Sequence, residues 1–250
     1  MSAAAWEALR RCTQARIALG RAGHALPTAA VLDFQLAHAR ARDAIHRSWD
    51  IASFAGEVAA RGWVPVIAST PVTSRVEYLK RPDLGRRLTD ESEQCLRSRH
   101  DPAIDVALIL TNGLSSTAMD RHGLPLLDAI VAALAAEGLG CGPICLAENG
   151  RVALSDPVGA ALGARLAVMV VGERPGLSAD DSLGIYLTYA PGPCNTDAER
   201  NCISNVRPPA GLSYAVAARK LAYLARQALR RQLSGVGLKD DEPGFALPKP

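Results

Sequence analysis

Short apolar segments alternate with helical patterns through the second half of the chain. Residues Ile104 to Leu110 form a run that is apolar except at Asp105, and it is followed by an Asn112-Gly113 turn and a candidate helix start at Ser115 or Ser116. Such a run is typical of a strand buried on both faces, as in a parallel sheet covered by helices. The pattern predicts an α/β fold built on a Rossmann-like parallel sheet.

Three later segments repeat the strand pattern: Ile144 to Ala147, Leu166 to Val171 and Ile185 to Tyr189. A short helix is predicted from Ser155 to Leu162, between the first two of these strands. The last long helix begins after the candidate N-cap Ser213 and carries a regular apolar stripe. Because strands that alternate with helices form parallel units, we expect four parallel strands in this domain.

The first hundred residues have a different character. Thr28 is a candidate N-cap for a helix predicted from Ala29 to His46, where apolar residues recur at helical spacing. From Val58 to Arg99 prolines and basic residues interrupt every regular pattern, so this segment is predicted to be an arm and not part of a core. The predicted parts are an N-terminal helical and extended arm over residues 1–101, a Rossmann-like domain over 102–238 and a disordered tail over 239–250.

The composition argues against several classes of protein. The 28 Lys and Arg residues are nearly balanced by 25 Asp and Glu residues, and aromatic residues make up only 4% of the 250, so we expect no nucleic-acid partner. No apolar stretch approaches the roughly 18 residues that cross a bilayer, so we expect no membrane segment. The first residues lack the features of a signal peptide, and six cysteines are too few for a disulfide scaffold in a chain this long. We therefore expect reduced thiols and a cytoplasmic protein.

The turns after the predicted strands are the places to look for a ligand. In open α/β sheets, ligands lie beyond the carboxyl ends of the strands. The turn Gly172-Glu173-Arg174-Pro175-Gly176 follows a predicted strand and places Glu173 where its carboxylate can accept hydrogen bonds from a ligand. The alternative is a purely structural turn in which Glu173 pairs with a nearby arginine. The residues alone leave both interpretations open.

His122 follows Asp120 in an arrangement that partly matches the Asp-x-His-x-x-Gly motif, by which some cobalamin proteins replace the lower base of the cofactor with histidine. The match fails because Pro125 occupies the position of the required glycine. We interpret His122 as part of a surface loop before a helix over Leu126 to Ala136.

The cysteines give no catalytic or metal-binding pattern. Cys141 and Cys145 are four residues apart, but no neighbouring His or Cys completes a zinc site. Cys194 and Cys202 lie far along the chain from all five histidines, which precede residue 123, so neither cysteine has an evident general base. A ligand-sized crevice without a catalytic set of residues indicates a binding subunit.

Five segments are distinctive, in order along the chain: residues 15–23, 34–44, 74–79, 172–177 and 202–205. Together they resemble the small (light) subunit of ethanolamine ammonia-lyase. This family uses adenosylcobalamin to convert ethanolamine to acetaldehyde and ammonia. The resemblance implies a hetero-oligomer with a large subunit, a TIM barrel that carries the substrate site and the radical chemistry.

The resemblance also implies cofactor-binding positions, which fall on Val152, Glu173 and Cys202. Cobalamin presents amide arms, ribose hydroxyls, a phosphate and an apolar benzimidazole, so a carboxylate acceptor and apolar or soft walls suit it. In this family the cofactor keeps its own lower base, in agreement with the failed motif at His122. No residue of this chain is expected to act as a catalytic acid, base or nucleophile, or to bind a metal ion.

Two alternatives accompany this interpretation. A stand-alone Rossmann-like enzyme would use the same crevice for a nucleotide cofactor, with Glu173 on a ribose. As for location, many relatives begin with a longer N-terminal extension that helps direct the enzyme into a bacterial microcompartment, whereas this chain reaches the matching region by Ala15. We therefore expect the cytoplasm and keep the microcompartment as the less favoured location.

Overall fold

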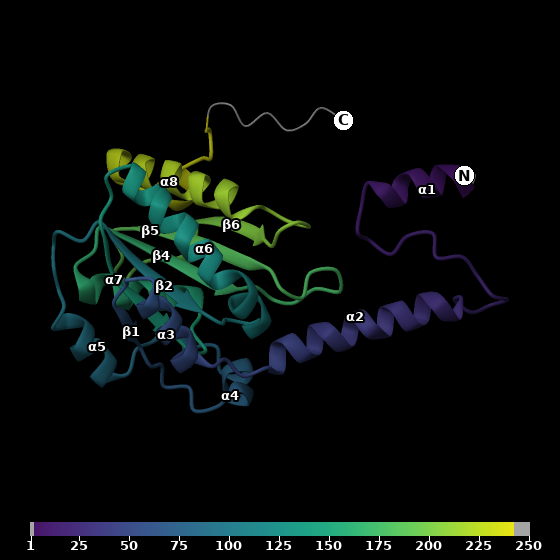
Figure 1. Cartoon of the computed structure of the whole chain (residues 1–250), viewed down its shortest axis with the longest axis horizontal. Helices are drawn as coiled ribbons and strands as arrows, with labels where there is room; N and C mark the ends of the chain where they lie inside the picture. The colour runs from purple at the N-terminus through teal and green to yellow at the C-terminus, as the bar shows by residue number, and fades with distance from the viewer. Residues whose placement is uncertain (1–2, 243–250) are drawn as a thin grey trace.

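The computed structural model describes residues 3–242, and within them one mostly parallel six-stranded sheet forms the centre of the molecule (Figure 1). The strand order is β1-β3-β2-β4-β5-β6. β1 to β4 are mutually parallel, whereas β5 is antiparallel to both β4 and β6. The strands are β1 (Pro65–Ile67), β2 (Val106–Thr111), β3 (Cys141–Ala147), β4 (Leu166–Gly172), β5 (Leu183–Tyr189) and β6 (Arg200–Val206).

Helices cover both faces of the sheet, as the continuous apolar strands require. Every residue of β2 and β4 is buried. On one face, α3 (Ile51–Ala60), α6 (Ser116–Ala136) and α8 (Tyr214–Arg231) contribute to a core with β2, β4 and β5. On the other face, α5 (Asp90–Arg97) and α7 (Ser155–Leu162) pack against the same strands. The prediction of an α/β fold is confirmed.

Serine caps fix the starts of two of the longest helices. The Ser115 hydroxyl accepts a hydrogen bond from the backbone N–H of Ala118 at the start of α6, and Ser213 does the same for Val216 in α8. The helix predicted after Thr28 is also present as α2 (Thr28–His46), although Pro27 is its N-cap residue and no side chain caps it. Local sequence therefore placed these helix starts to within one residue.

β5 does not have the expected direction. Residues 173–182 connect it to β4 as an irregular loop, without the helix that a parallel crossover needs. The strand consequently returns antiparallel to β4, with Val170 beside Ile185. The prediction of four parallel strands is right for β2, β3 and β4 and wrong for β5, and the fourth parallel strand is β1.

Residues 58–99 pack on the sheet, in contrast to the predicted arm. β1 pairs with β3 at one edge of the sheet, and Pro65 is tolerated as its first residue. Tyr78 of α4 (Arg75–Lys80) and Leu96 of α5 are buried. Within the described residues, the segment before α3 projects from the body: α2 extends outward and α1 (Ala3–Arg11) lies at its far end (Figure 1).

The interpretation of His122 as a surface-loop residue is wrong. α6 runs without a break from Ser116 to Ala136 and includes Pro125. His122 lies within it, 7% exposed, with Nδ1 2.7 Å from the hydroxyl oxygen of Tyr214 on α8. The packing of α6 against α8 and the sheet stabilises this helix despite the backbone hydrogen bond that proline removes.

The predicted tail lies largely outside the described residues, which end at Glu242. Its first residues follow α8, where Lys220 pairs with Asp240 and Arg219 pairs with Glu242. Short 3-10 turns complete the described chain: Leu84–Arg86, Val152–Leu154, Asp197–Glu199 and Gly235–Gly237. No helix of the described part is long and apolar enough to cross a membrane.

Candidate functional site

The carboxyl ends of β2, β3 and β4 meet at one edge of the sheet and form the base of the candidate site. The helices that follow β2 and β3 cover opposite faces, so the turns diverge there, as at the ligand crevice of an open α/β sheet. The side chain of Asn112 accepts from the backbone N–H of Asn149 at 2.7 Å, and Thr111 Oγ1 accepts from that of Gly150 at 3.0 Å. Buried polar side chains therefore hold the turns after β2 and β3 together.

Two glycines let the turns after β2 and β4 approach each other. Gly113 has a φ of +48°, and a Cβ atom there would lie 2.5 Å from the carbonyl oxygen of Gly172. A Cβ atom on Gly172 would lie 2.3 Å from the carbonyl oxygen of Asn112. Because neither position has room for a side chain, both need glycine.

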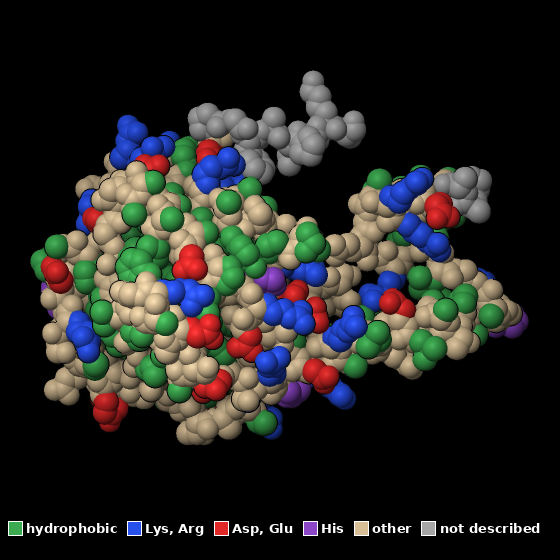
Figure 2. Space-filling model, viewed as in Figure 1, with side chains coloured by type: hydrophobic (Ala, Val, Ile, Leu, Met, Phe, Trp, Pro, Cys, Tyr) green, Lys and Arg blue, Asp and Glu red, His purple; other side chains and the backbone are tan. Residues whose placement is uncertain are grey.

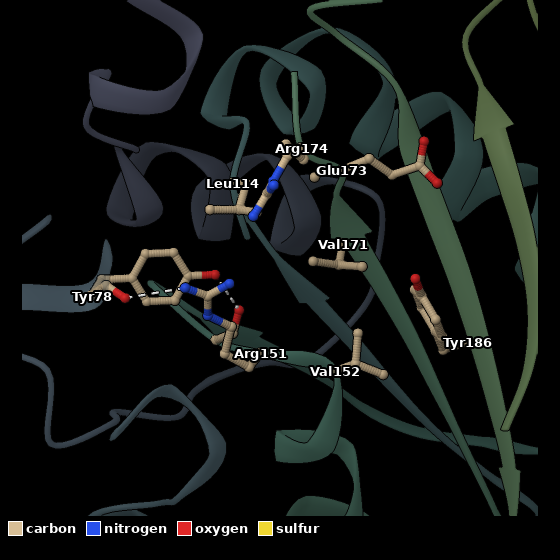
Figure 3. A pocket seen from close by; sticks show the side chains of 10 residues that line it. Tyr78, Leu114, Arg151, Val152, Val171, Glu173, Arg174 and Tyr186 are labelled. Carbon is tan, nitrogen blue, oxygen red and sulfur yellow. Dashed lines mark hydrogen bonds between the residues drawn. The ribbon is translucent and has the colours of Figure 1, made fainter. Parts of the chain in front are cut away.

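A cavity of about 420 Å³ lies over these turns (Figure 3). Val152, Val171 and Tyr186 give it an apolar and aromatic surface. Arg151 and Tyr78 lie on one side of Val152 and Val171, and Tyr186 and the carboxylate of Glu173 lie on the other. The cavity thus has a cationic side and an anionic side separated by apolar groups.

A neighbouring cavity of about 360 Å³ continues the same groove toward β6. Arg151, Val152 and Tyr186 line both cavities, and Cys202 lines the second. Tyr186 and Cys202 face each other as partners in the β5–β6 ladder. The structure therefore brings Val152, Glu173 and Cys202, which are distant in the sequence, to a single groove around Tyr186.

Glu173 is already engaged by hydrogen-bond donors of the protein. The hydroxyl of Ser182 donates to Oε2 at 2.7 Å and that of Ser204 donates to Oε1 at 2.5 Å. The backbone N–H of Asn205 also donates to Oε2 at 3.2 Å. These partners differ from the arginine that the structural interpretation of the turn anticipated. They fix the carboxylate between β5 and β6, and its remaining lone pairs can still accept from a ligand.

The ionisable groups beside the groove favour binding over catalysis. Burial raises the pKa of Cys202, an effect that a hydrogen bond from Tyr186 partly offsets. Burial, together with Cys202, also raises the pKa of Tyr186. Both groups are therefore protonated at neutral pH, and a protonated thiol is a poor nucleophile.

The other candidate residues stay outside the groove or give no site. His122 and Cys194 are not among the residues that line either cavity. Burial raises the pKa of Cys141 to about 11 and that of Cys145 to about 12, as expected for structural thiols. Within residues 3–242 no three His, Cys, Asp or Glu side chains are grouped so that they could hold a metal ion.

Sequence reasoning missed Tyr78, Arg151 and Tyr186. Tyr78 lay in the predicted arm, and Tyr186 lay inside a predicted strand without any sign of which face it would occupy. Arg151 directly precedes Val152, and this adjacency in the sequence could have indicated that Arg151 lies at the same site.

Comparison with known proteins agrees with the resemblance stated above. The family model for the ethanolamine ammonia-lyase light chain (EutC) matches residues 3–239. Proteins named ethanolamine ammonia-lyase small subunit from Pseudomonas fluorescens and Azotobacter vinelandii are each 54% identical over 239 residues, which is 94% of this chain and 87% and 88% of theirs. The one from Ralstonia nicotianae is 52% identical over 238 residues, with 94% and 88% covered. The chain therefore belongs to the ethanolamine ammonia-lyase light chain family.

Proposed function

We propose that this chain is the non-catalytic, cofactor-binding small subunit of an adenosylcobalamin-dependent ethanolamine ammonia-lyase. The observation that carries the proposal is the convergence of Val152, Glu173 and Cys202 on one groove at the carboxyl edge of the sheet. No nucleophile paired with a general base lines this groove in the described part of the chain. A binding role accounts for both features.

The groove suits part of a cobalamin. Val152 and Tyr186 offer apolar surface to a benzimidazole, and Glu173 offers carboxylate oxygens to hydroxyl or amide hydrogens. Cavities of roughly 300 to 1,000 Å³ bury drug-sized ligands, and adenosylcobalamin is much larger than those. The groove would therefore hold one side of the cofactor, and the large subunit would cover the rest.

The division of labour follows from these residues. When bound, the cofactor supplies the radical chemistry, which belongs to the cofactor and not to protein side chains. The residues of this chain would position the cofactor: Glu173 fixes its orientation, and Val152 and Cys202 keep water from one side of it. Substrate groups would be supplied by the large subunit, which we expect to be a TIM barrel.

We propose that the projecting arm, residues 3–46, contacts the large subunit. Leu32 is 58% exposed and Leu36 is 51% exposed, and Phe34 is exposed between them. Figure 2 shows hydrophobic side chains on the part of the molecule that projects from the body. Exposed apolar side chains on more than one face of a projecting helix are typical of an interaction surface.

Co-expression with a large subunit tests the function. We expect the purified chain alone to show no ethanolamine deamination, and the assembled complex with adenosylcobalamin to be active. Equilibrium dialysis should show cobalamin bound by the complex. Deamination by the chain alone would contradict the proposal and favour the stand-alone enzyme. An assembled complex that binds no cobalamin would contradict the cofactor-binding role.

A further inference from the structure

Arg151 lies beside the groove, and no described residue supplies a counter-ion for it. Among its side-chain donors, Nη2 alone has a hydrogen-bond partner in the described part of the chain, the carbonyl oxygen of Tyr78 at 3.1 Å. Nε is buried without a partner. No carboxylate of residues 3–242 forms an ion pair with Arg151, whereas the nearby Arg200 is paired with Asp156 at 2.7 Å. A partly buried guanidinium without an anion is costly unless a ligand supplies one.

Tyr78 holds this guanidinium in place. The Arg151 guanidinium carbon lies 4.2 Å from the centroid of the Tyr78 ring, in a cation–π contact. The Tyr78 hydroxyl in turn donates to the carbonyl oxygen of Gly150 at 3.0 Å. The Arg151 backbone N–H donates to the carbonyl oxygen of Gly85 at 2.7 Å. Arg151 is therefore positioned before any ligand arrives, which lowers the entropic cost of binding.

A second arginine contacts the same tyrosine ring. The guanidinium carbon of Arg75 lies 4.9 Å from the centroid of the Tyr78 ring. Burial lowers the pKa of Arg75, and the charge of Arg151 lowers it further. Two guanidinium groups thus share one tyrosine ring, but Arg75 does not line the cavity and donates to the carbonyl oxygens of Ile45 and Gly113, so Arg151 is the group that faces a ligand. Arg174, which is exposed, lines the same cavity.

We propose that Arg151, positioned by Tyr78, binds a phosphodiester, namely the phosphate of the nucleotide loop of cobalamin. The guanidinium fork matches the geometry of phosphate oxygens. Glu173, which would repel a phosphate, lies across the apolar part of the cavity (Figure 3). The ligand would therefore place its phosphate toward Tyr78 and its hydroxyl or amide groups toward Glu173. This inference rests on the proposed cofactor-binding function and assigns an orientation within it.

Truncated corrinoids test the inference in the assembled two-subunit complex. Cobinamide lacks the phosphate, the ribose and the benzimidazole, and cobinamide phosphate restores the phosphate alone. We expect the complex to bind cobinamide phosphate about 10- to 100-fold more tightly than cobinamide, as measured by equilibrium dialysis with detection of corrin absorbance. Equal affinities in the wild-type complex would overturn the inference, whatever any variant does.

The Arg151→Gln variant tests whether Arg151 causes the preference for cobinamide phosphate over cobinamide. We expect it to remove most of the preference for the phosphorylated compound while its cobinamide affinity changes little. The control Arg230→Gln removes the same charge from the last turn of α8 and should keep the full preference. A preference unchanged in Arg151→Gln would overturn the assignment and leave the proposed function standing. A wild-type complex with no detectable cobalamin binding would overturn both the phosphate assignment and the proposed function.

Discussion

Glu173 shows how one carboxylate can join two strands and face a ligand at once. It accepts a hydrogen bond from Ser182, which directly precedes β5, and another from Ser204, which lies in β6. Both hydroxyls can rotate to suit a neutral amide, so an exchange of Glu for Gln disturbs the fold little.

We expect Glu173→Gln to weaken cobalamin binding in the assembled complex by about 1 to 3 kcal/mol, or about tenfold to a hundredfold. Gln removes the charge and turns one acceptor into a donor. The dissociation constant from a cobalamin titration is the measurement. Glu137→Gln, which alters an ion pair with Arg226 at the end of α6, is the control. If both variants bound cobalamin equally well, Glu173 would have only a structural role.

Asp181 organises the loop that carries Glu173. Its carboxylate lies 2.8 Å from Arg121, 3.1 Å from Arg207 and 3.4 Å from the Nε2 atom of His122. Burial by itself would raise the pKa of Asp181, but the hydrogen bonds from Arg121 and His122 and the charge of Arg207 outweigh it and lower the pKa. The ionised carboxylate therefore stabilises the folded state.

The sign of the pH effect follows from this lowered pKa. The contribution of Asp181 is fully present above its unfolded-state pKa of about 3.9 and is lost as the pH falls through the lower folded-state value. We expect Asp181→Asn to lower the free energy of unfolding at pH 7 by about 1 to 3 kcal/mol. The difference from wild type should shrink below about pH 4 in urea titrations. A difference that stayed constant between pH 7 and pH 3 would show that the charge is unimportant.

Among the elements, α1 and α2 differ from the rest because little of the body covers them. The linker between them, residues 12–27, contains Arg21, which is exposed. In contrast, the side chains of Tyr78 and Leu96, within residues 61–99, are buried. Exposed linkers are the preferred sites of proteolysis.

We expect trypsin to cut the isolated chain within residues 12–27 and to spare residues 61–99. In the complex with the large subunit the linker should become resistant. Mass spectrometry of timed digests identifies the cuts. Equal cleavage of the linker in both states would show that the arm is not the contact with the large subunit. Rapid cleavage within residues 61–99 would contradict their packing on the sheet.

For the molecule as a whole, assembly should depend on apolar side chains that the fold leaves exposed. We expect Phe34→Ser to change the free energy of unfolding of the chain by less than about 0.5 kcal/mol, because Phe34 is 44% exposed. It should weaken association with the large subunit by about 1 to 3 kcal/mol. Sedimentation velocity over a range of concentrations measures this. Val236→Ser, at a site 72% exposed outside the arm, is the control and should assemble normally.

The local patterns that predicted the fold are those whose physics is local. The serine caps at Ser115 and Ser213 predict helix starts, and the apolar runs of β2 and β4 predict strands that are buried on both faces. Each of these patterns depends on residues only a few positions apart. The resemblance similarly pointed to Val152, Glu173 and Cys202 by their neighbours along the chain.

The groove itself depends on contacts between segments that are remote in the chain. Tyr78 meets Arg151 only because residues 58–99 fold back onto the sheet, and Tyr186 meets Cys202 only because β5 reverses direction. Pro125 remains inside α6 because α8 packs against that helix. Such contacts reflect burial summed over the whole core, so no short stretch of sequence contains the information that specifies them.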